Sequence, residues 1–213
     1  MKIAGVILAR GGSKGIPNKN IIKINGKPLI QYSIDALIQS NCGPIFVSTN
    51  DRQIANVSKS LGANIINRPD DLATDISTSE SALLHAVNFI DADIIIFVQP
   101  TSPLIEAKYI NEGLEKLNKY DSVFSVFEDH WLPSWTEEIT PIDWDINNRP
   151  RRQDKKTKLI ENGAFYINHS SNILKDNNRL SGNIGCSVMN DKTYFEIDSE
   201  DDWKIIESII NES

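Results

Sequence analysis

Cysteine and histidine are scarce in this chain of 213 residues. The two cysteines, Cys42 and Cys186, are too few for a disulfide framework, and they follow no metal-ligand spacing. We expect both to be buried as small apolar side chains. None of the three histidines, His85, His130 and His169, stands in a recognisable catalytic-triad context. The sequence therefore does not predict catalysis through a covalent protein nucleophile.

Long apolar runs and an excess of positive charge are also missing. The apolar runs are too short to cross a bilayer, and no secretory signal precedes the first expected strand. We therefore expect a cytoplasmic protein that does not bind membranes. The net charge of -7 argues against a general nucleic-acid-binding protein. Positive charges gather in residues 10–23 and 149–158, a distribution that suits a small anionic substrate.

The glycine-rich segment 9–20 carries the strongest functional signal. It follows an apolar run, residues 3–8, that is typical of a buried strand. Its glycines allow the backbone amides to approach anionic oxygens closely. Arg10, Lys14 and Lys19 add three positive charges that suit a polyphosphate. The segment therefore predicts a phosphate-binding loop, with a solvated basic turn as the alternative.

This loop differs from the two common phosphate-binding motifs. A P-loop ends in Gly-Lys-Ser or Gly-Lys-Thr, whereas the order here is Ser13-Lys14-Gly15. The dinucleotide fingerprint packs its last glycine inside a helix, whereas Pro17 and a polar stretch follow here.

Apolar strands and amphipathic helices alternate through residue 127. The expected strands are residues 3–8, 45–48, 63–66, 94–99 and 122–127, and the expected helices are residues 28–38, 51–61, 77–89 and 105–117. Ser77 and Glu80 form a capping-box pattern at the start of the third helix. Strands separated by helices of this length pair in parallel through right-handed crossovers. The sequence thus predicts an α/β protein with a doubly wound, mostly parallel, Rossmann-like sheet.

Polar segments follow four of the expected strands. Ligands of such sheets bind outside the carboxyl ends of the strands, so these segments should meet at one edge. They are residues 9–20, 49–51, 68–69 and 99–101.

The segment 129–160 interrupts the alternation. It carries Trp131, Trp135 and Trp144 among prolines and charges, without a helical or alternating pattern. Long irregular segments in compact domains are usually functional or disordered, and three tryptophans argue against disorder. We interpret it as an arm that covers the site or binds a second subunit. The remaining expected elements are a strand at residues 163–167 and a helix at residues 201–210, within a single domain of residues 1–213.

Two carboxylates precede the last expected helix. If Glu196 and Asp198 lie in a strand, both point to the same face and can hold Mg2+, which prefers oxygen ligands. The alternative is negative charge that stabilises a helix N-terminus, which we prefer for Glu200 and Asp201. We assign Asp198 to the metal and leave Glu196 open between the two.

A basic glycine-rich loop, a doubly wound sheet and a downstream acidic pair together suit nucleotidyl transfer. In that reaction a sugar oxygen attacks the α-phosphorus of a nucleoside triphosphate, and pyrophosphate leaves. The chemistry needs charge neutralisation and in-line placement of the attacking group rather than a protein nucleophile.

Five segments resemble, in the same order, the N-acylneuraminate cytidylyltransferases, also called CMP-sialic acid synthetases. They are residues 8–20, residues 68–75, residues 99–104, residues 151–154 with 161–167, and residues 196–203. The first (LARGGSKGIPNKN) and the third (QPTSPL) are the most specific. The resemblance spans nearly the whole chain.

The resemblance implies a Rossmann-like nucleotidyltransferase fold. It also implies transfer of CMP from CTP to the anomeric hydroxyl of an acidic nine-carbon 2-keto sugar, with Mg2+ as cofactor. Arg10, Lys14 and Lys19 would hold the triphosphate. The other substrate contacts that it implies are Ser13, Asn20, Arg68 and Ser79 in the nucleotide pocket, Gln99 facing the sugar, and Arg152 and Gln153 on the arm. A homodimer in which the arm reaches into the partner's site is implied as well.

One departure concerns the metal. The family's closing motif is usually Asp-x-Asp, whereas this chain has Glu196-Ile197-Asp198. Glutamate still binds Mg2+, but its longer reach changes where the metal sits, so Asp198 is the stronger metal candidate. The resemblance implies that the sugar is N-acylneuraminic acid or a relative such as legionaminic or pseudaminic acid. The alternatives are a cytidylyltransferase for the eight-carbon acid Kdo and a non-catalytic module that senses nucleotide or sugar.

Overall fold

The computed structural model of the protein describes residues 1–129 and 131–212. Its main sheet has seven strands. They are β1 (Ile3–Leu8), β4 (Ile45–Thr49), β5 (Asn64–Asn67), β6 (Ile94–Val98), β7 (Ser122–Asp129), β10 (Lys158–His169) and β11 (Ile184–Met189). The order across the sheet is β11-β7-β10-β6-β1-β4-β5. All paired neighbours are parallel except that β10 runs antiparallel to β6 and β7, so the predicted mostly parallel sheet is confirmed.

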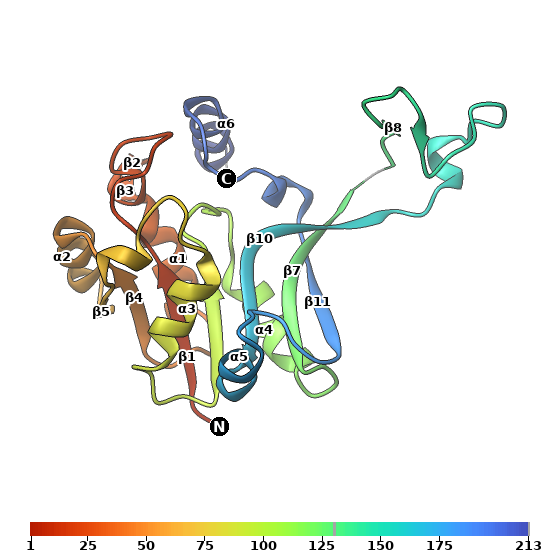
Figure 1. The fold of residues 1–213 in the computed structure, drawn as a ribbon. Coiled ribbons are helices and arrows are strands. Elements are labelled where there is room, and N and C mark those ends of the chain that lie inside the picture. Colours follow the sequence, from red (N-terminus) through yellow and green to blue (C-terminus); the bar gives the residue numbers. More distant parts are fainter. Residues whose placement is uncertain (130, 213) are drawn as a thin grey trace.

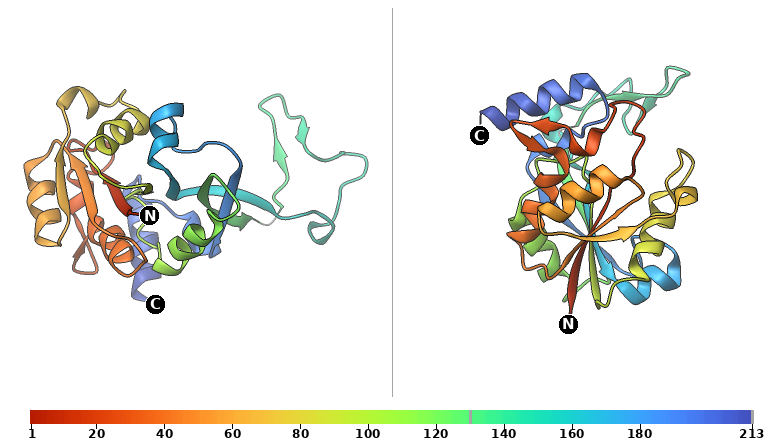
Figure 2. Two further views of the ribbon diagram at one scale, coloured as in Figure 1. Left: turned by 90° about the horizontal axis from the view of Figure 1, so that it is seen from below. Right: turned by 90° about the vertical axis from the view of Figure 1, so that its left-hand side faces the viewer.

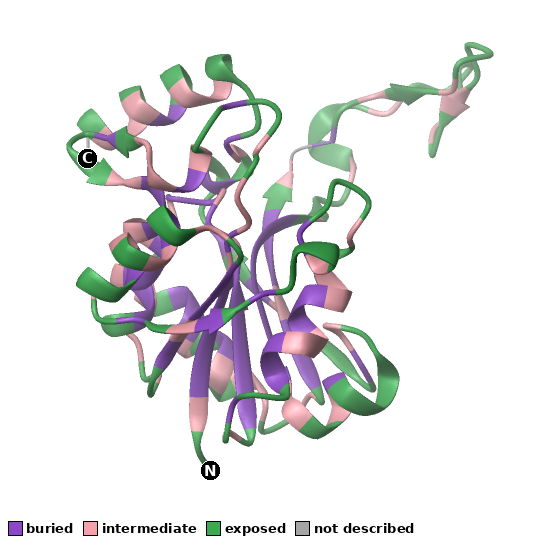
Figure 3. Cartoon of the chain, turned by 60° about the vertical axis from the view of Figure 1, so that its left-hand side comes forward, coloured by how far each residue is buried: buried purple, intermediate pink, exposed green. Residues whose placement is uncertain are grey.

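Helices cover both faces of this sheet (Figure 1). They are α1 (Leu29–Ile38), α2 (Arg52–Ser60), α3 (Ser79–Val87), α4 (Ala107–Lys116) and α5 (Ser170–Asp176). Helices α1, α2 and α4 pack on the face that buries Ile7 and Ile96. Helices α3 and α5 pack on the opposite face with Val6 and Phe97. Because adjacent strand residues point to opposite faces, this alternation confirms the doubly wound arrangement. Figure 3 shows that burial concentrates along these strands.

The last helix, α6 (Glu200–Asn211), lies apart from both layers, across the carboxyl ends of the central strands (Figure 2). Its Ile206 is fully buried against Ile16 and Leu29, so the helix is anchored to the segment that follows β1. A capping box between Ser199 and Asp202 fixes its start. This packing holds residues 196–199 close to the glycine-rich loop.

The start of α3 differs from the prediction. The N-cap is Thr78, whose hydroxyl accepts a backbone hydrogen bond from the first turn at 3.1 Å. Ser77 instead binds the backbone of the preceding turn, residues 71–74. Glu80 is drawn away from a capping role because it forms an ion pair with Arg179. The predicted Ser77–Glu80 capping box was therefore wrong.

The arm departs from the body of the molecule. Strands β7 and β10 extend outward, and the segment between them projects away from the sheet in Figures 1 and 2. Within it β8 (Ser134–Trp135) pairs with β9 (Pro141–Ile142). The Trp144 ring meets Trp135 edge-on at 4.9 Å between centroids, and Trp131 at 6.3 Å. Exposed apolar side chains on the arm are Leu132, Trp135, Ile139, Ile142, Ile146 and Leu159.

Both cysteines are only partly buried, contrary to our expectation. Cys186 lies on the edge strand β11, where one side of the strand has no neighbour in the sheet. Cys42 lies beside β1 and Gly5, and its burial raises the pKa of its thiol to about 12. A thiol with so high a pKa stays protonated near neutral pH and is therefore a poor nucleophile.

No helix among residues 1–129 and 131–212 is long and apolar enough to span a membrane. The short elements not yet named are β2 (Lys23–Ile24), β3 (Lys27–Pro28), η1 (Lys19–Ile21), η2 (Asp70–Leu72), η3 (Arg152–Asp154) and η4 (Asp191–Tyr194).

Candidate active site

A cavity of about 350 Å³ opens at the carboxyl ends of β1 and β6. Most of the predicted site residues line it: Arg10, Ser13, Lys14, Lys19, Asn20, Arg68, Ser79, Gln99 and Asp198. Of the four polar segments expected at this edge, only residues 49–51 do not line the cavity. There Asn50 accepts a hydrogen bond from the Gly11 amide at 3.0 Å and supports the loop.

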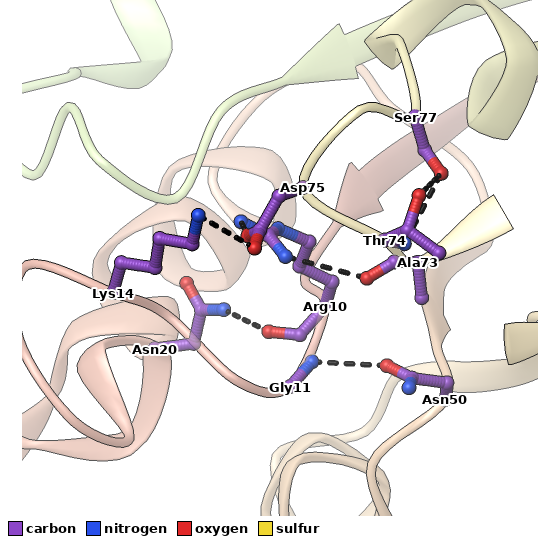
Figure 4. A network of polar contacts seen from close by, with 9 residues as sticks. All are labelled: Arg10, Gly11, Lys14, Asn20, Asn50, Ala73, Thr74, Asp75 and Ser77. Atoms are coloured by element: carbon purple, nitrogen blue, oxygen red, sulfur yellow. Dashed lines mark hydrogen bonds and ion pairs between the residues drawn. The ribbon is translucent and has the colours of Figure 1, made fainter. Parts of the chain in front are cut away.

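Two loop cations converge on one carboxylate. Asp75 Oδ1 accepts from Arg10 at 2.9 Å, and its other oxygen lies 2.8 Å from Lys14 Nζ (Figure 4). These contacts, that with Lys14 above all, lower the pKa of Asp75 below its ordinary value. Arg10 also donates to the Ala73 carbonyl at 3.3 Å. The basic loop therefore faces the segment before α3 across the mouth of the cavity.

The third loop cation is bound to the acidic segment. Lys19 Nζ donates to Asp198 Oδ1 at 3.0 Å and to the Ile197 carbonyl at 2.8 Å. Ile197 itself donates its amide to the Thr101 carbonyl at 2.9 Å. The loop after β1, the turn after β6 and the segment before α6 thus meet at this point.

Arg68 and Asn20 are built into the cavity wall. Arg68 is 7% exposed and donates to the hydroxyl and carbonyl oxygens of Ser48 at 3.1 and 2.7 Å. Burial, with a smaller effect from the Arg10 charge, lowers the pKa of Arg68 to about 10. Asn20 is buried and donates to the Arg10 carbonyl at 3.0 Å, which fixes the shape of the loop.

Glu196 and Asp198 do not lie in a strand, so the same-face argument was wrong. Residues 195–199 run without regular structure because they cross from η4 to the capping box of α6. The two carboxylates are nevertheless close enough to interact. The pKa of Glu196 is raised to about 7, mainly by burial and also by the neighbouring Asp198 charge, while the Lys19 charge opposes the rise.

Glu196 faces a second hollow of about 380 Å³ rather than the first cavity. Asp198 lines both spaces. The second hollow also carries the Tyr194 ring and two further acidic side chains, Glu161 and Asp202. Its lining is therefore negatively charged, in contrast to the basic first cavity.

The arm residues Arg152 and Gln153 do not reach the cavity within one chain. Both are exposed on η3 of the projecting arm. Arg152 has no ion-pair partner among the described residues. Neither His85 nor His169 lines the cavity, and His130 lies outside the described residues.

Thr78 and Asp75 are among the residues of this site that were not singled out from the sequence. Thr78 lines the cavity where the N-terminus of α3 begins. Asp75 bridges two loop cations, although it lies 65 positions from Arg10. Thr78 could have been found, because threonine is also a good N-cap. The Asp75 contact could not, because it depends on how two distant loops meet.

The sequence matches the cytidylyltransferase family over residues 4–204. N-acylneuraminate cytidylyltransferase A of Danio rerio is 36% identical over 224 residues, covering 96% of this chain and 50% of that protein. The N-acylneuraminate cytidylyltransferase of Escherichia coli O18:K1:H7 is 30% identical over 216 residues, covering 96% and 51%. The chain thus spans about half the length of the curated relatives it matches.

Two solved structures share the fold. A CMP-2-keto-3-deoxy-manno-octonic acid synthetase complexed with CTP has a TM-score of 0.76 at 17% identity, covering 100% of this chain and 99% of that one. A 4-diphosphocytidyl-2C-methyl-D-erythritol synthase from Anaerococcus prevotii has a TM-score of 0.70 at 10% identity, covering 99% of both chains. The fold, the basic cavity and the match over residues 4–204 agree: this chain belongs to the cytidylyltransferase family.

Proposed function

We propose that the protein transfers CMP from CTP to the anomeric hydroxyl of a nine-carbon 2-keto acid sugar of the N-acylneuraminate type. The observation that carries the proposal is the single cavity that Arg10, Lys14, Lys19 and Asp198 line together. The names and coverage of the relatives in Danio rerio and Escherichia coli support the choice of sugar.

In the proposed reaction the loop cations act on the triphosphate. The acceptor oxygen forms a bond to the α-phosphorus, the bond from that phosphorus to the bridging oxygen breaks, and the proton of the hydroxyl passes to solvent. Arg10, Lys14 and Lys19 neutralise the negative charge that grows on the departing pyrophosphate. Because Lys19 is only 14% exposed, its charge acts in a less solvated place than that of Lys14.

The donor set of this site fits Mg2+. Among the described residues no three His, Cys, Asp or Glu side chains form a ready-made metal cage. Mg2+ typically takes only one or two carboxylates and fills its shell with water and phosphate oxygens. Asp198, which lines the basic cavity, would supply one carboxylate, and Glu196, on the side of the second hollow, is the candidate for a second. A bound Mg2+ would add charge neutralisation at the phosphates.

The acceptor side of the site needs positive charge from elsewhere. The hollow next to Asp198 carries Glu161 and Glu196, and such a lining repels a sugar acid. We propose that the protein is a homodimer in which the partner's arm brings Arg152 and Gln153 to this region, beside Gln99. Exposed apolar side chains on the arm support an interface there.

The test of the function is pyrophosphate release from CTP and Mg2+ with a panel of acceptors. The panel contains N-acetylneuraminic, legionaminic and pseudaminic acids and Kdo, and mass spectrometry identifies each product. We expect one nine-carbon acid to give its CMP-sugar. A CMP-sugar formed only from Kdo would overturn the choice of acceptor. CTP binding without turnover on any acid would favour a sensing module.

A further inference from the structure

Asp75 occupies the cations of the phosphate-binding loop in the ligand-free protein. Its two carboxylate oxygens are divided between Arg10 and Lys14, at 2.9 and 2.8 Å (Figure 4). Each donor hydrogen directed at Asp75 cannot at the same time donate to a phosphate oxygen. The loop is thus already bound to an anion that belongs to the protein itself.

A triphosphate bound in the cavity changes the balance of charge around the loop cations. Arg10, Lys14, Lys19 and Arg68 line one cavity, and Arg10 and Arg68 repel one another. Without a ligand, Asp75 offsets part of this positive charge. When a triphosphate brings several negative charges, the Asp75 carboxylate becomes a competing charge a few ångströms away. Asp75 and the triphosphate therefore cannot both bind Arg10 and Lys14 fully at the same time.

The position of Asp75 allows it to leave. Its side chain is 43% exposed, and its neighbour Ile76 is 91% exposed, so this stretch is open to solvent. The segment on either side is held by contacts that do not involve the carboxylate. Arg10 donates to the Ala73 carbonyl, and Ser77 binds the backbone of Thr74.

We propose that Asp75 is an internal counter-ion that competes with the triphosphate of CTP, and with pyrophosphate, for Arg10 and Lys14. This inference rests on the proposed function, because it requires that the loop bind polyphosphate. Asp75 leaves the two cations when CTP enters and returns to them as pyrophosphate departs. The carboxylate therefore weakens the affinity for both anions and shortens the time that pyrophosphate stays bound.

The experiment is isothermal titration calorimetry of the 213-residue wild-type chain, Asp75→Asn and Asp75→Ala with CTP and, separately, with inorganic pyrophosphate. We expect both variants to bind each anion about three- to tenfold more tightly, as the loss of two exposed ion pairs allows. Cytidine, which carries no phosphate, should bind all three proteins equally. That comparison separates a charge effect from a change in the shape of the pocket.

Asp71→Asn is the matched control, because Asp71 is an exposed acid in the same segment and pairs with no cation in the described part of the chain. Its affinities should stay within about twofold of wild type. Unchanged or weaker anion binding by Asp75→Asn and Asp75→Ala would overturn the inference while leaving the function intact. If wild type binds neither CTP nor pyrophosphate, the proposed function and the inference fall together.

Discussion

Lys19 and Asp198 form an ion pair of 3.0 Å although they stand 179 positions apart in the sequence. The lysine is 14% exposed and the aspartate 74% exposed. The contact joins the loop after the first strand to the segment before the last helix. Since Asp198 lines both the basic cavity and the acidic hollow, Lys19 stands at the boundary between them.

If the proposed function holds, replacing Lys19 with alanine should lower turnover by about 10²- to 10³-fold, because it would remove from a poorly solvated position a charge that neutralises the phosphates. The fold should survive, since the ion pair it loses has an exposed partner. Steady-state pyrophosphate release and thermal unfolding measure the two effects. Lys23→Ala is the control, an exposed lysine on β2 that does not line the cavity. Near-normal turnover in Lys19→Ala would remove this residue from the site.

Asp198→Asn should shift the Mg2+ titration of activity to higher concentration or abolish activity, because an amide is a weaker and neutral ligand. Asp201→Asn is the matched control. Asp201 lies in the same acidic stretch but pairs with Lys204 on the surface of α6. An Mg2+ titration of Asp198→Asn that overlays wild type would contradict the metal assignment, whatever the effect on turnover.

Most of the fold was predictable from periodicity, because its first half alternates buried strands with amphipathic helices. Within the second half of the sheet, strands at residues 122–127 and 163–167 were expected, but their order in the sheet and strand β11 were not predicted. Strand β10 inserts between β6 and β7, so its partners lie far from it in sequence. Strand β11 lies at the edge of the sheet and mixes exposed with buried residues. Its short sequence pattern therefore resembles that of a loop.

The candidate site, too, was only partly predictable from the sequence. Arg10, Lys14 and Lys19 were recognisable because they surround glycines directly after a strand, a local pattern. The closeness of Glu196 and Asp198 was anticipated for the wrong reason: the turn into α6, rather than a strand, brings them together. The Asp75 contact has no local signal at all, because it forms only when the segment before α3 meets the first loop.

Gly15→Ala should impair catalysis more than stability. A Cβ added there would lie 2.4 Å from the Asp198 carbonyl oxygen, so the loop and the acidic segment would have to separate. We expect at least about a tenfold loss of turnover, with a stability cost of about 1–3 kcal/mol for the overpacking. Gly26→Ala is the contrasting variant. It has a φ of +79° and nothing within 4 Å of an added Cβ, so it should cost about 1 kcal/mol of stability and leave turnover of the folded enzyme unchanged. Equal turnover in the two variants would mean that this close approach does not matter for the reaction.

The proposed dimer predicts that two inactive variants restore one another. If each site combines Lys19 of one subunit with Arg152 of its partner, a mixed dimer of Lys19→Ala and Arg152→Ala holds one intact site and one doubly altered site. Random exchange then gives half mixed dimers and about a quarter of wild-type activity. The two variants are mixed, unfolded and refolded together so that their subunits exchange. Each variant alone, treated in the same way, is the control. Sedimentation of the mixture establishes that dimers are present. Activity no higher than the average of the separate variants, in a mixture that sediments as dimers, would mean that the arm does not act in its partner's site.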